Sequence, residues 1–200
     1  MELFTFPLGQ LETNCYVLAD EKTHRCAIVD PGDDGDAVAQ WLSGKGLPPA
    51  YIFLTHGHYD HVGGLAALRA AYPDLPVYVH AADTRLAAAM TRGLSWTDFY
   101  EDGDEISMDS ITFQVLETPG HTPGSVCLLA GSLLFAGDTL FAGSCGRTDF
   151  PGGSWKAMLA SLKRLSALPG DYTVLPGHGE ASTLDQERQT NPYMKEAMAQ

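Results

Sequence analysis

The sequence predicts an α/β fold in which helices cover sheets of short, apolar strands. Two observations predict it: strand-like and helix-like hydrophobic patterns alternate along the whole 200-residue chain, and several strands are too apolar to face water. Two sheets packed together with helices outside would cover these strands. Periodicity by itself leaves other α/β arrangements open.

The predicted strands are short runs rich in β-branched, aromatic and other apolar residues. The clearest alternation lies in 111–117, where Ile111, Phe113 and Val115 share one face. The runs on either side of Gly131 predict a tight hairpin. We expect strands at 14–19, 26–30, 50–54, 77–80, 111–117, 125–130, 132–136 and 172–175.

The predicted helices have apolar residues at helical spacing. Val38, Trp41 and Leu42 would share one face of the helix at 35–44. Pro169-Gly170 would end the amphipathic helix at 154–167. The segment 81–91 is rich in alanine. We expect helices at 35–44, 62–71, 81–91, 154–167 and around 182–190.

Length and charge limit the classes of protein that fit. The 200 residues suit one domain spanning 1–200. The formal net charge of −13 disfavours binding to nucleic acids and to anionic membranes. It still permits an anionic small substrate, because bound metal ions can reverse the local field. No apolar stretch is long enough to span a bilayer, and no secretory signal stands at the N-terminus.

The cysteines predict a reduced, cytoplasmic protein. Cys15, Cys26, Cys127 and Cys145 include no C-x-x-C pair, and the first three lie in apolar runs. Cys145 is the one cysteine whose surroundings would suit a metal ligand, although a structural thiol is the more ordinary interpretation.

A dense group of metal-binding residue types directly follows the apolar strand expected at 50–54. The segment 55–61 reads T-H-G-H-Y-D-H, with His56, His58, Asp60 and His61. Imidazole nitrogen and carboxylate oxygen suit zinc and neighbouring first-row metals. Alternate residues of an extended loop can point the same way, so the first two histidines could share one ion and the last two residues could face a second.

Three further candidates follow other strands. His121 and His178 each stand in a Pro-Gly-His tripeptide, and Asp138 follows the apolar run that ends at Ala136. Each residue alone would read as a turn residue. Together with the first group they make five histidines and two aspartates, which are too many for one ion. Seven such ligands fit two ions with a shared carboxylate, the arrangement of two-metal hydrolases.

In combination, these motifs resemble the metallo-β-lactamase superfamily. The segment 55–61 matches its T-H-x-H-x-D-H motif, and His121, Asp138 and His178 follow in the family's order. The segments 11–16 and 28–32 also look like its opening strands. The resemblance implies an αββα sandwich of two mixed β-sheets with helices on the outer faces and metals at one edge.

The resemblance also implies how the ligands divide between two divalent ions, zinc first, with iron or manganese as alternatives. By this resemblance His56, His58 and His121 hold one ion, Asp60, His61 and His178 hold the other, and Asp138 bridges them. A metal-bridging hydroxide would attack the substrate, with Asp60 and Asp138 as catalytic residues.

Within the superfamily the chain is most similar to short bacterial glyoxalase II-like proteins, which are hydroxyacylglutathione hydrolases. The similarity rests on 137–153 and on 190–193. It implies hydrolysis of a thioester, S-D-lactoylglutathione or a related hydroxyacylglutathione. Arg147 stands where the family places a basic residue against glutathione, although it could instead pair with Asp149. Gly179-Glu180 departs from the family, which has a tyrosine there.

Other activities remain open at this stage. A persulfide dioxygenase, an oxidoreductase, would hold a single iron with His56, His58 and His121. The diiron oxygen-reducing branch usually has a carboxylate in place of His58. A nuclease is disfavoured by the charge, and a β-lactamase or lactonase by the aspartate at 138. A non-enzymatic metal-binding module is disfavoured because open, carboxylate-containing sites suit catalysis better.

Overall fold

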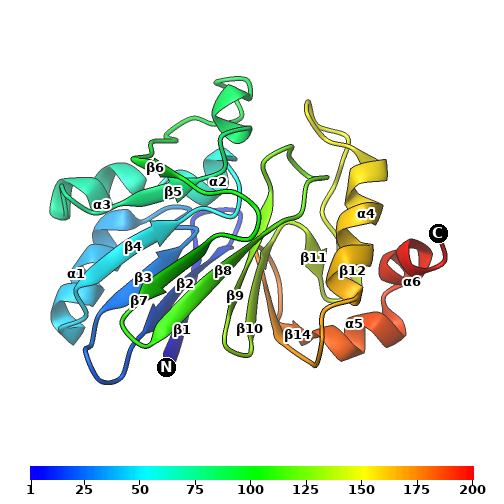
Figure 1. Ribbon diagram of the computed structural model, residues 1–200. Helices are drawn as coiled ribbons and strands as arrows, with labels where there is room; N and C mark the ends of the chain where they lie inside the picture. Colours follow the sequence, from blue (N-terminus) through cyan, green and yellow to red (C-terminus); the bar gives the residue numbers. More distant parts are fainter.

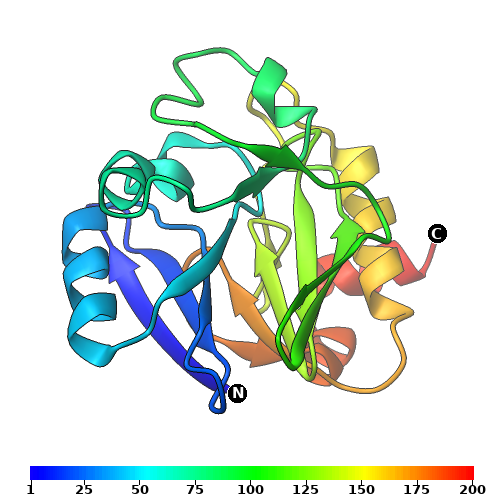
Figure 2. The same cartoon turned by 60° about the vertical axis from the view of Figure 1, so that its left-hand side comes forward.

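Two six-stranded β-sheets pack face to face in the computed structural model, which describes residues 1–200, and helices cover both outer faces (Figure 1). The α1 and α3 helices lie outside the first sheet, and α4 and α6 lie outside the second, as Figure 2 also shows. This is the αββα sandwich that the resemblance predicts, so the fold class is confirmed.

The first sheet comes from the N-terminal half of the chain and has mixed strand directions. Its first three strands are antiparallel neighbours, and the following pairs are parallel. Its strands in spatial order are β1 (Glu2–Leu8), β2 (Thr13–Ala19), β3 (Cys26–Val29), β4 (Pro49–Phe53), β5 (Val77–Val79) and β6 (Asp98–Phe99). Its helices are α1 (Gly35–Lys45), α2 (Tyr59–Val62) and α3 (Leu65–Ala71).

The second sheet is also mixed, because β10 and β13 run parallel while the other pairs are antiparallel. Its strands in spatial order are β14 (Ser182–Thr183), β13 (Thr173–Pro176), β10 (Leu133–Gly137), β9 (Val126–Ala130), β8 (Ile111–Glu117) and β7 (Glu105–Met108). A small separate hairpin consists of β11 (Leu140–Phe141) and β12 (Ser144–Cys145). The helices of this half are α4 (Trp155–Ser166), α5 (Leu184–Thr190) and α6 (Pro192–Met198).

Three apolar layers hold the sandwich together, as an αββα arrangement requires. The first packs the first sheet against α1 and α3, with Leu42 and Leu68 fully buried. The second fills the space between the sheets, where the rings of Phe53 and Phe113 lie 4.8 Å apart. The third packs the second sheet against α4 and α6 around Leu162.

The ends of several strands meet at one edge of the sandwich. The backbone amide of Val126 donates to the carbonyl of Thr55 at 2.8 Å, and the amide of Asn14 donates to the carbonyl of Gly177 at 2.8 Å. Each bond joins a strand residue of one sheet to the segment just beyond a strand of the other sheet. The loops after β4, β8, β10 and β13 therefore start from neighbouring points of a rigid frame.

Two predicted helices differ from the structure. The helix expected at 62–71 is divided into α2 and α3 at Gly63 and Gly64, where a side chain on Gly64 would approach the carbonyl oxygens of Pro31 and Asp33 to 2.9 Å. The prediction of a helix at 81–91 is wrong. Only a 3-10 turn, η1 (Asp83–Arg85), forms there. The Asp83 side chain turns inward to accept three hydrogen bonds, and these tertiary contacts override the helix propensity of the alanines.

The other predicted elements match the structure to within about two residues at each end, as expected for boundaries. Sequence patterns did not predict the short strands β6, β7, β11, β12 and β14, nor β1 and α6. All four cysteines are free thiols. None of the helices has the length and the apolar character needed to cross a membrane.

Candidate metal centre

The polar segment after β4 carries four of the predicted ligands. The β4 strand ends at Phe53, and the chain then bends at Thr55 and His56 and is extended at His58 before α2 begins at Tyr59. Asp60 and His61 therefore lie in the first turn of a short helix, and they point differently from the two histidines before them. The loop after β8 supplies His121, the end of β10 supplies Asp138, and the loop after β13 supplies His178.

The structure brings all seven predicted side chains together. Their ligand atoms form three overlapping groups, and within each group the atoms lie within 4.8 Å of one another. The groups are His56, His58 and His121; His56, His61 and Asp138; and Asp60, His61 and His178. The first and last groups have the same members as the two ligand sets that the family resemblance implies, and Asp138 lies between them.

Close approaches between ring nitrogens and carboxylate oxygens define the centre. His58 Nδ1 lies 2.9 Å from His121 Nε2, which in turn lies 3.5 Å from Asp138 Oδ2. The other oxygen of Asp138 lies 3.4 Å from His61 Nε2. The Asp138 carboxylate thus faces the first histidine group with one oxygen and His61 with the other.

The second group is built around Asp60. Its Oδ2 lies 3.3 Å from His178 Nε2 and 3.8 Å from His61 Nε2. A hydrogen bond from His178 Nδ1 to the carbonyl of Leu11, at 3.1 Å, orients the ring. The contact between His178 Nε2 and Asp60 raises the pKa of His178.

Several buried ligand atoms have no hydrogen-bond partner in the chain. They are His56 Nε2, His61 Nε2 and Asp138 Oδ1. Unpartnered polar atoms are rare inside proteins because each costs desolvation free energy. Two imidazoles and a carboxylate pointing at a common centre are a donor set that divalent first-row cations satisfy. The residues present therefore fit a metal centre.

Electrostatics at the centre also suit cations. Burial, followed by repulsion from neighbouring imidazoles, lowers the pKa of His56 well below its usual value and that of His58 to about 4. Neutral imidazole is the form that binds metals. Burial would lower the pKa of His61, but Asp138 and Asp30 outweigh it and raise that pKa. Burial would also raise the pKa of Asp138, yet the nearby His61 holds it at about 2.

Asp30 orients two residues of the centre from behind. This buried carboxylate accepts from the Thr55 hydroxyl at 2.6 Å and lies 3.0 Å from His61 Nδ1. A proton on Nδ1 leaves Nε2 as the free lone pair, so Asp30 selects the tautomer of His61 that can bind a cation. Asp30 directly follows β3, and that position was the available signal for a role that sequence patterns did not assign.

Asp83 is a second supporting carboxylate that sequence analysis missed. Fully buried, it accepts from the amides of Gly57 and Gly124 at 2.8 and 2.7 Å and from the Thr122 hydroxyl at 2.8 Å. It therefore connects the loop of His56 and His58 to the loop of His121. An alanine-rich segment gave no signal for this role.

Two cavities open beside the centre and share Leu11, Tyr59 and Asp60. The first, of about 540 Å³, lies on the side of the turn after β1. The second, of about 660 Å³, lies on the side of the β11–β12 hairpin and includes Phe141 and Phe150.

The remaining candidate residues take different positions. Arg147 lines the second cavity, where its guanidinium pairs with Asp149 through two bonds of 2.7 Å and stacks 3.8 Å from the centre of the Phe150 ring. Cys145 lines the same cavity but belongs to none of the ligand groups. His80 lies apart and pairs with Glu117 at 3.0 Å.

Comparison with known families identifies this arrangement. The profile of the metallo-beta-lactamase superfamily matches residues 8–178. The chain belongs to the metallo-β-lactamase superfamily. The resemblance seen in the sequence is therefore confirmed, and superfamily membership implies divalent cations at the His/Asp cluster.

Individual metallo-β-lactamase-fold proteins cover nearly the whole chain. A probable metallo-hydrolase of Bacillus subtilis, YqgX, is 37% identical and aligns over 94% of this chain and 95% of its own. The hydroxyacylglutathione hydrolase GloC of Haemophilus influenzae is 30% identical over 97% of this chain and 98% of its own. These relatives agree with a metal-dependent hydrolase.

Solved structures of the superfamily show the same fold. The BLEG-1 B3 metallo-beta-lactamase superposes with a TM-score of 0.87 at 35% identity, over 96% of this chain and 99% of its own. TTHA1623 in a di-iron-bound form superposes with a TM-score of 0.84 at 39% identity, over 95% of this chain and 99% of its own.

Proposed function

We propose that this protein is a binuclear metal-dependent thioester hydrolase that cleaves S-D-lactoylglutathione or a related hydroxyacylglutathione. The observation that carries the proposal is the pair of three-ligand groups at one cavity floor, with Asp138 between them. The relative GloC, named as a hydroxyacylglutathione hydrolase, supports the choice of substrate.

Seven residues would hold two ions. His56, His58 and His121 would hold one, Asp60, His61 and His178 the other, and Asp138 would reach both. When bound, two divalent cations supply an activated water molecule and polarise the thioester carbonyl. We propose zinc, with iron or manganese as alternatives, because His and Asp ligands accept all three metals. The di-iron form of TTHA1623 makes iron the first alternative to test.

The side chains around the centre support attack by water and not by a side-chain nucleophile. Cys145 is the one thiol that lines the second cavity, and burial raises its pKa to about 11. Such a thiol stays protonated near neutral pH and is a weak nucleophile. Asp60 lines both cavities, so its carboxylate could orient a water molecule toward a carbonyl carbon lying between them. A thiolate leaves readily and needs little help from a general acid.

The second cavity suits the glutathione part of the substrate. Phe141, Phe150 and Met90 give it apolar walls, and Arg147 stands at its edge. Asp149 occupies two nitrogens of the Arg147 guanidinium, Nε and Nη2, which leaves Nη1 without a partner in the chain. We propose that Nη1 pairs with a carboxylate of glutathione, so Asp149 holds the guanidinium flat against Phe150 and does not replace the substrate.

The decisive experiment combines elemental analysis of purified protein with a hydrolysis assay. We expect about two metal ions per chain and metal-dependent loss of S-D-lactoylglutathione, with free thiol as a product. Full hydrolysis by metal-stripped protein would refute the proposal. One iron per chain with oxygen uptake on glutathione persulfide would instead support the persulfide dioxygenase alternative. Cleavage of a β-lactam without thioester hydrolysis would show that the protein is a β-lactamase, as BLEG-1 is named.

A further inference from the structure

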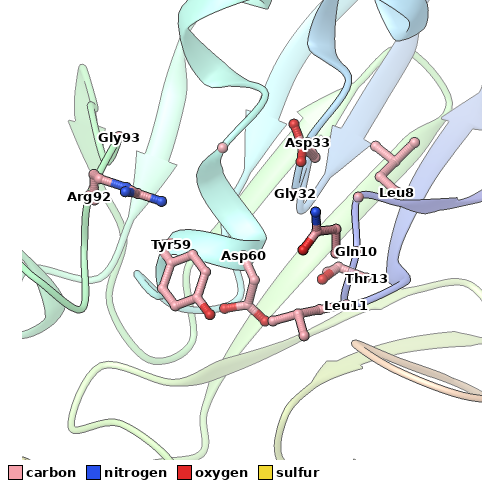
Figure 3. Close-up of a pocket in the computed structure, with 12 residues that line it drawn as sticks. Leu8, Gln10, Leu11, Thr13, Gly32, Asp33, Tyr59, Asp60, Arg92 and Gly93 are labelled. Carbon is pink, nitrogen blue, oxygen red and sulfur yellow. The ribbon is translucent and has the colours of Figure 1, made fainter.

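The first cavity is separate from the proposed glutathione cavity but reaches the same centre. Figure 3 shows Tyr59 and Asp60 on one side of it and Gln10, Leu11 and Thr13 on the other. Because Asp60, Tyr59 and Leu11 line both cavities, a molecule whose reacting carbon lies at the centre can extend into each. A thioester has two such parts, the thiol and the acyl group.

The first cavity is more polar than the second. Three of its twelve lining residues are hydrophobic, against six of thirteen in the second cavity. In Figure 3 the side chains of Gln10 and Arg92 extend into it from opposite sides. Neither side chain hydrogen-bonds to another residue of the chain, so both are free for a ligand. Both side chains are exposed and can bond to water, and a hydroxylated acyl group could replace that water where an apolar one could not.

Thr13 is the most informative residue of this cavity. It is 1% exposed, and its hydroxyl oxygen is buried without any hydrogen-bond partner in the chain. An exposed threonine would bond to water, but a buried unpaired hydroxyl costs free energy and calls for an explanation. A hydroxyl both donates and accepts, which is what a hydroxyl on a ligand requires.

The position of Thr13 connects it to the reacting centre. A Cβ added to Gly32 would lie 3.0 Å from Thr13 Cβ and 2.1 Å from the carbonyl oxygen of Asp60. Thr13 and the backbone of Asp60 therefore both lie against the side of Gly32 where a side chain would stand. A ligand group bonded to the Thr13 hydroxyl would lie beside the proposed ligand Asp60.

Resting on the proposed thioester hydrolysis, we propose that the first cavity binds the acyl group and selects acyl groups that carry a hydroxyl. The thiol part occupies the second cavity with its apolar walls, so the acyl part extends toward Gln10 and Thr13. The Thr13 hydroxyl and the Gln10 amide form the hydrogen bonds to the acyl hydroxyl. The carbonyl carbon remains at the centre, and Thr13 acts as a residue that determines specificity.

The test compares two glutathione thioesters that differ in one hydroxyl, S-D-lactoylglutathione and S-propionylglutathione. We expect the native protein to prefer the lactoyl ester in kcat/KM. In Thr13→Val, whose side chain has nearly the same shape, we expect that preference to fall about tenfold, the size of one hydrogen bond. Thr173→Val changes an exposed strand threonine remote from both cavities and should keep the native preference. An unchanged preference in Thr13→Val would overturn the proposal.

A binding measurement separates this proposal from the proposed activity. Calorimetry with D-lactate and with propionate tests the cavity without any hydrolysis. We expect the metal-loaded native protein to bind D-lactate more tightly than propionate. In Thr13→Val we expect the ratio of the two affinities to fall about tenfold. If neither thioester is cleaved but this binding difference is found, the activity is wrong and the hydroxyl-binding cavity is right. If Thr13→Val keeps the full preference for D-lactate, chelation by the metals explains it and the proposed role of Thr13 is wrong.

Discussion

The buried carboxylate of Asp83 accepts a 2.8 Å hydrogen bond from the backbone amide of Gly57, the residue between His56 and His58. The same carboxylate bonds to Thr122 and Gly124 beyond β8. One side chain thus sets the distance between two loops that carry proposed ligands of a single ion. Supporting contacts of this kind tune metal affinity without touching the metal.

Replacing Asp83 with asparagine should weaken metal binding while keeping the shape of the side chain. The amide nitrogen would face a donor, so at least one of the three hydrogen bonds would be lost. We expect a loss of about 1–3 kcal/mol in the free energy of unfolding and a 10–100-fold loss in metal affinity. Chemical denaturation and competition with a chelator measure the two effects. Asp98→Asn, an exposed aspartate of β6, is the matched control, and equal metal affinity in both variants would contradict the proposed role.

Changing individual ligands should remove metal in a pattern that depends on the group. His58→Ala changes one group, so we expect about one ion per chain to remain. Asp138→Ala removes the carboxylate that faces both groups, so both ions should bind weakly. Elemental analysis after gel filtration gives the stoichiometry. His24→Asn alters an exposed histidine outside the cluster and should keep full loading. Two tightly bound ions in Asp138→Ala would exclude a bridging carboxylate.

Asn191 should matter for substrate binding although it lies outside both cavities. Its amide donates to the carbonyl of Ser144 at 2.9 Å and to Glu187 at 2.8 Å, and its oxygen caps α6. These bonds hold the β11–β12 hairpin, which lines the second cavity through Phe141 and Cys145. We expect Asn191→Ala to lose about 1–2 kcal/mol of stability, as for other helix caps.

The same variant should raise KM for the thioester and leave the metal content unchanged, because the hairpin supplies no ligand. Steady-state kinetics on metal-loaded protein measure this. Thr190→Ala is the control, since the Thr190 hydroxyl bonds only within its own helix, to the carbonyl of Gln186. A native KM in Asn191→Ala would show that the hairpin keeps its position without this contact.

The seven clustered residues could be predicted from the sequence because they stand in polar segments that follow recognisable apolar strands. Strands β8, β10 and β13 of the second sheet run in the same direction, and they end at the same edge of the sandwich as β4 of the first sheet, so residues that are far apart in sequence become neighbours. The supporting carboxylates could be predicted only in part. Asp30 follows β3 in the same way, but its partners, Thr55 and His61, depend on how β3 and β4 pair.

Asp83 shows where local sequence information ends. Its segment has strong helix propensity, yet three hydrogen bonds to distant loops hold it in a single turn. Propensity differs by only tenths of a kcal/mol per residue, whereas a buried, unsatisfied carboxylate would cost several times more. The tertiary contacts win, and no pattern within 81–91 reports them. The strands β11 and β12 could not be predicted either, because each has only two residues and so shows no hydrophobic alternation.

Asp20 should make the sandwich sensitive to acid. At the end of β2, its carboxylate accepts from the Ser110 hydroxyl and from the backbone amides of Lys22 and Thr23, and so joins the first sheet to the β7–β8 turn. These bonds, that from Ser110 first, lower the pKa of Asp20 far below its usual value. A carboxyl group with a lowered pKa in the folded state contributes stability above its unfolded pKa, near 4, and loses that stability as the pH falls toward the folded value.

We therefore expect Asp20→Asn to be less stable than the native protein at pH 7 and the difference to shrink below about pH 4. Denaturation curves from pH 7 to pH 2 test this, with Asp74→Asn, an exposed aspartate in the turn before β5, as the control. A stability difference between native protein and Asp20→Asn that stays constant over this range would show that the Asp20 charge does not hold the two sheets together.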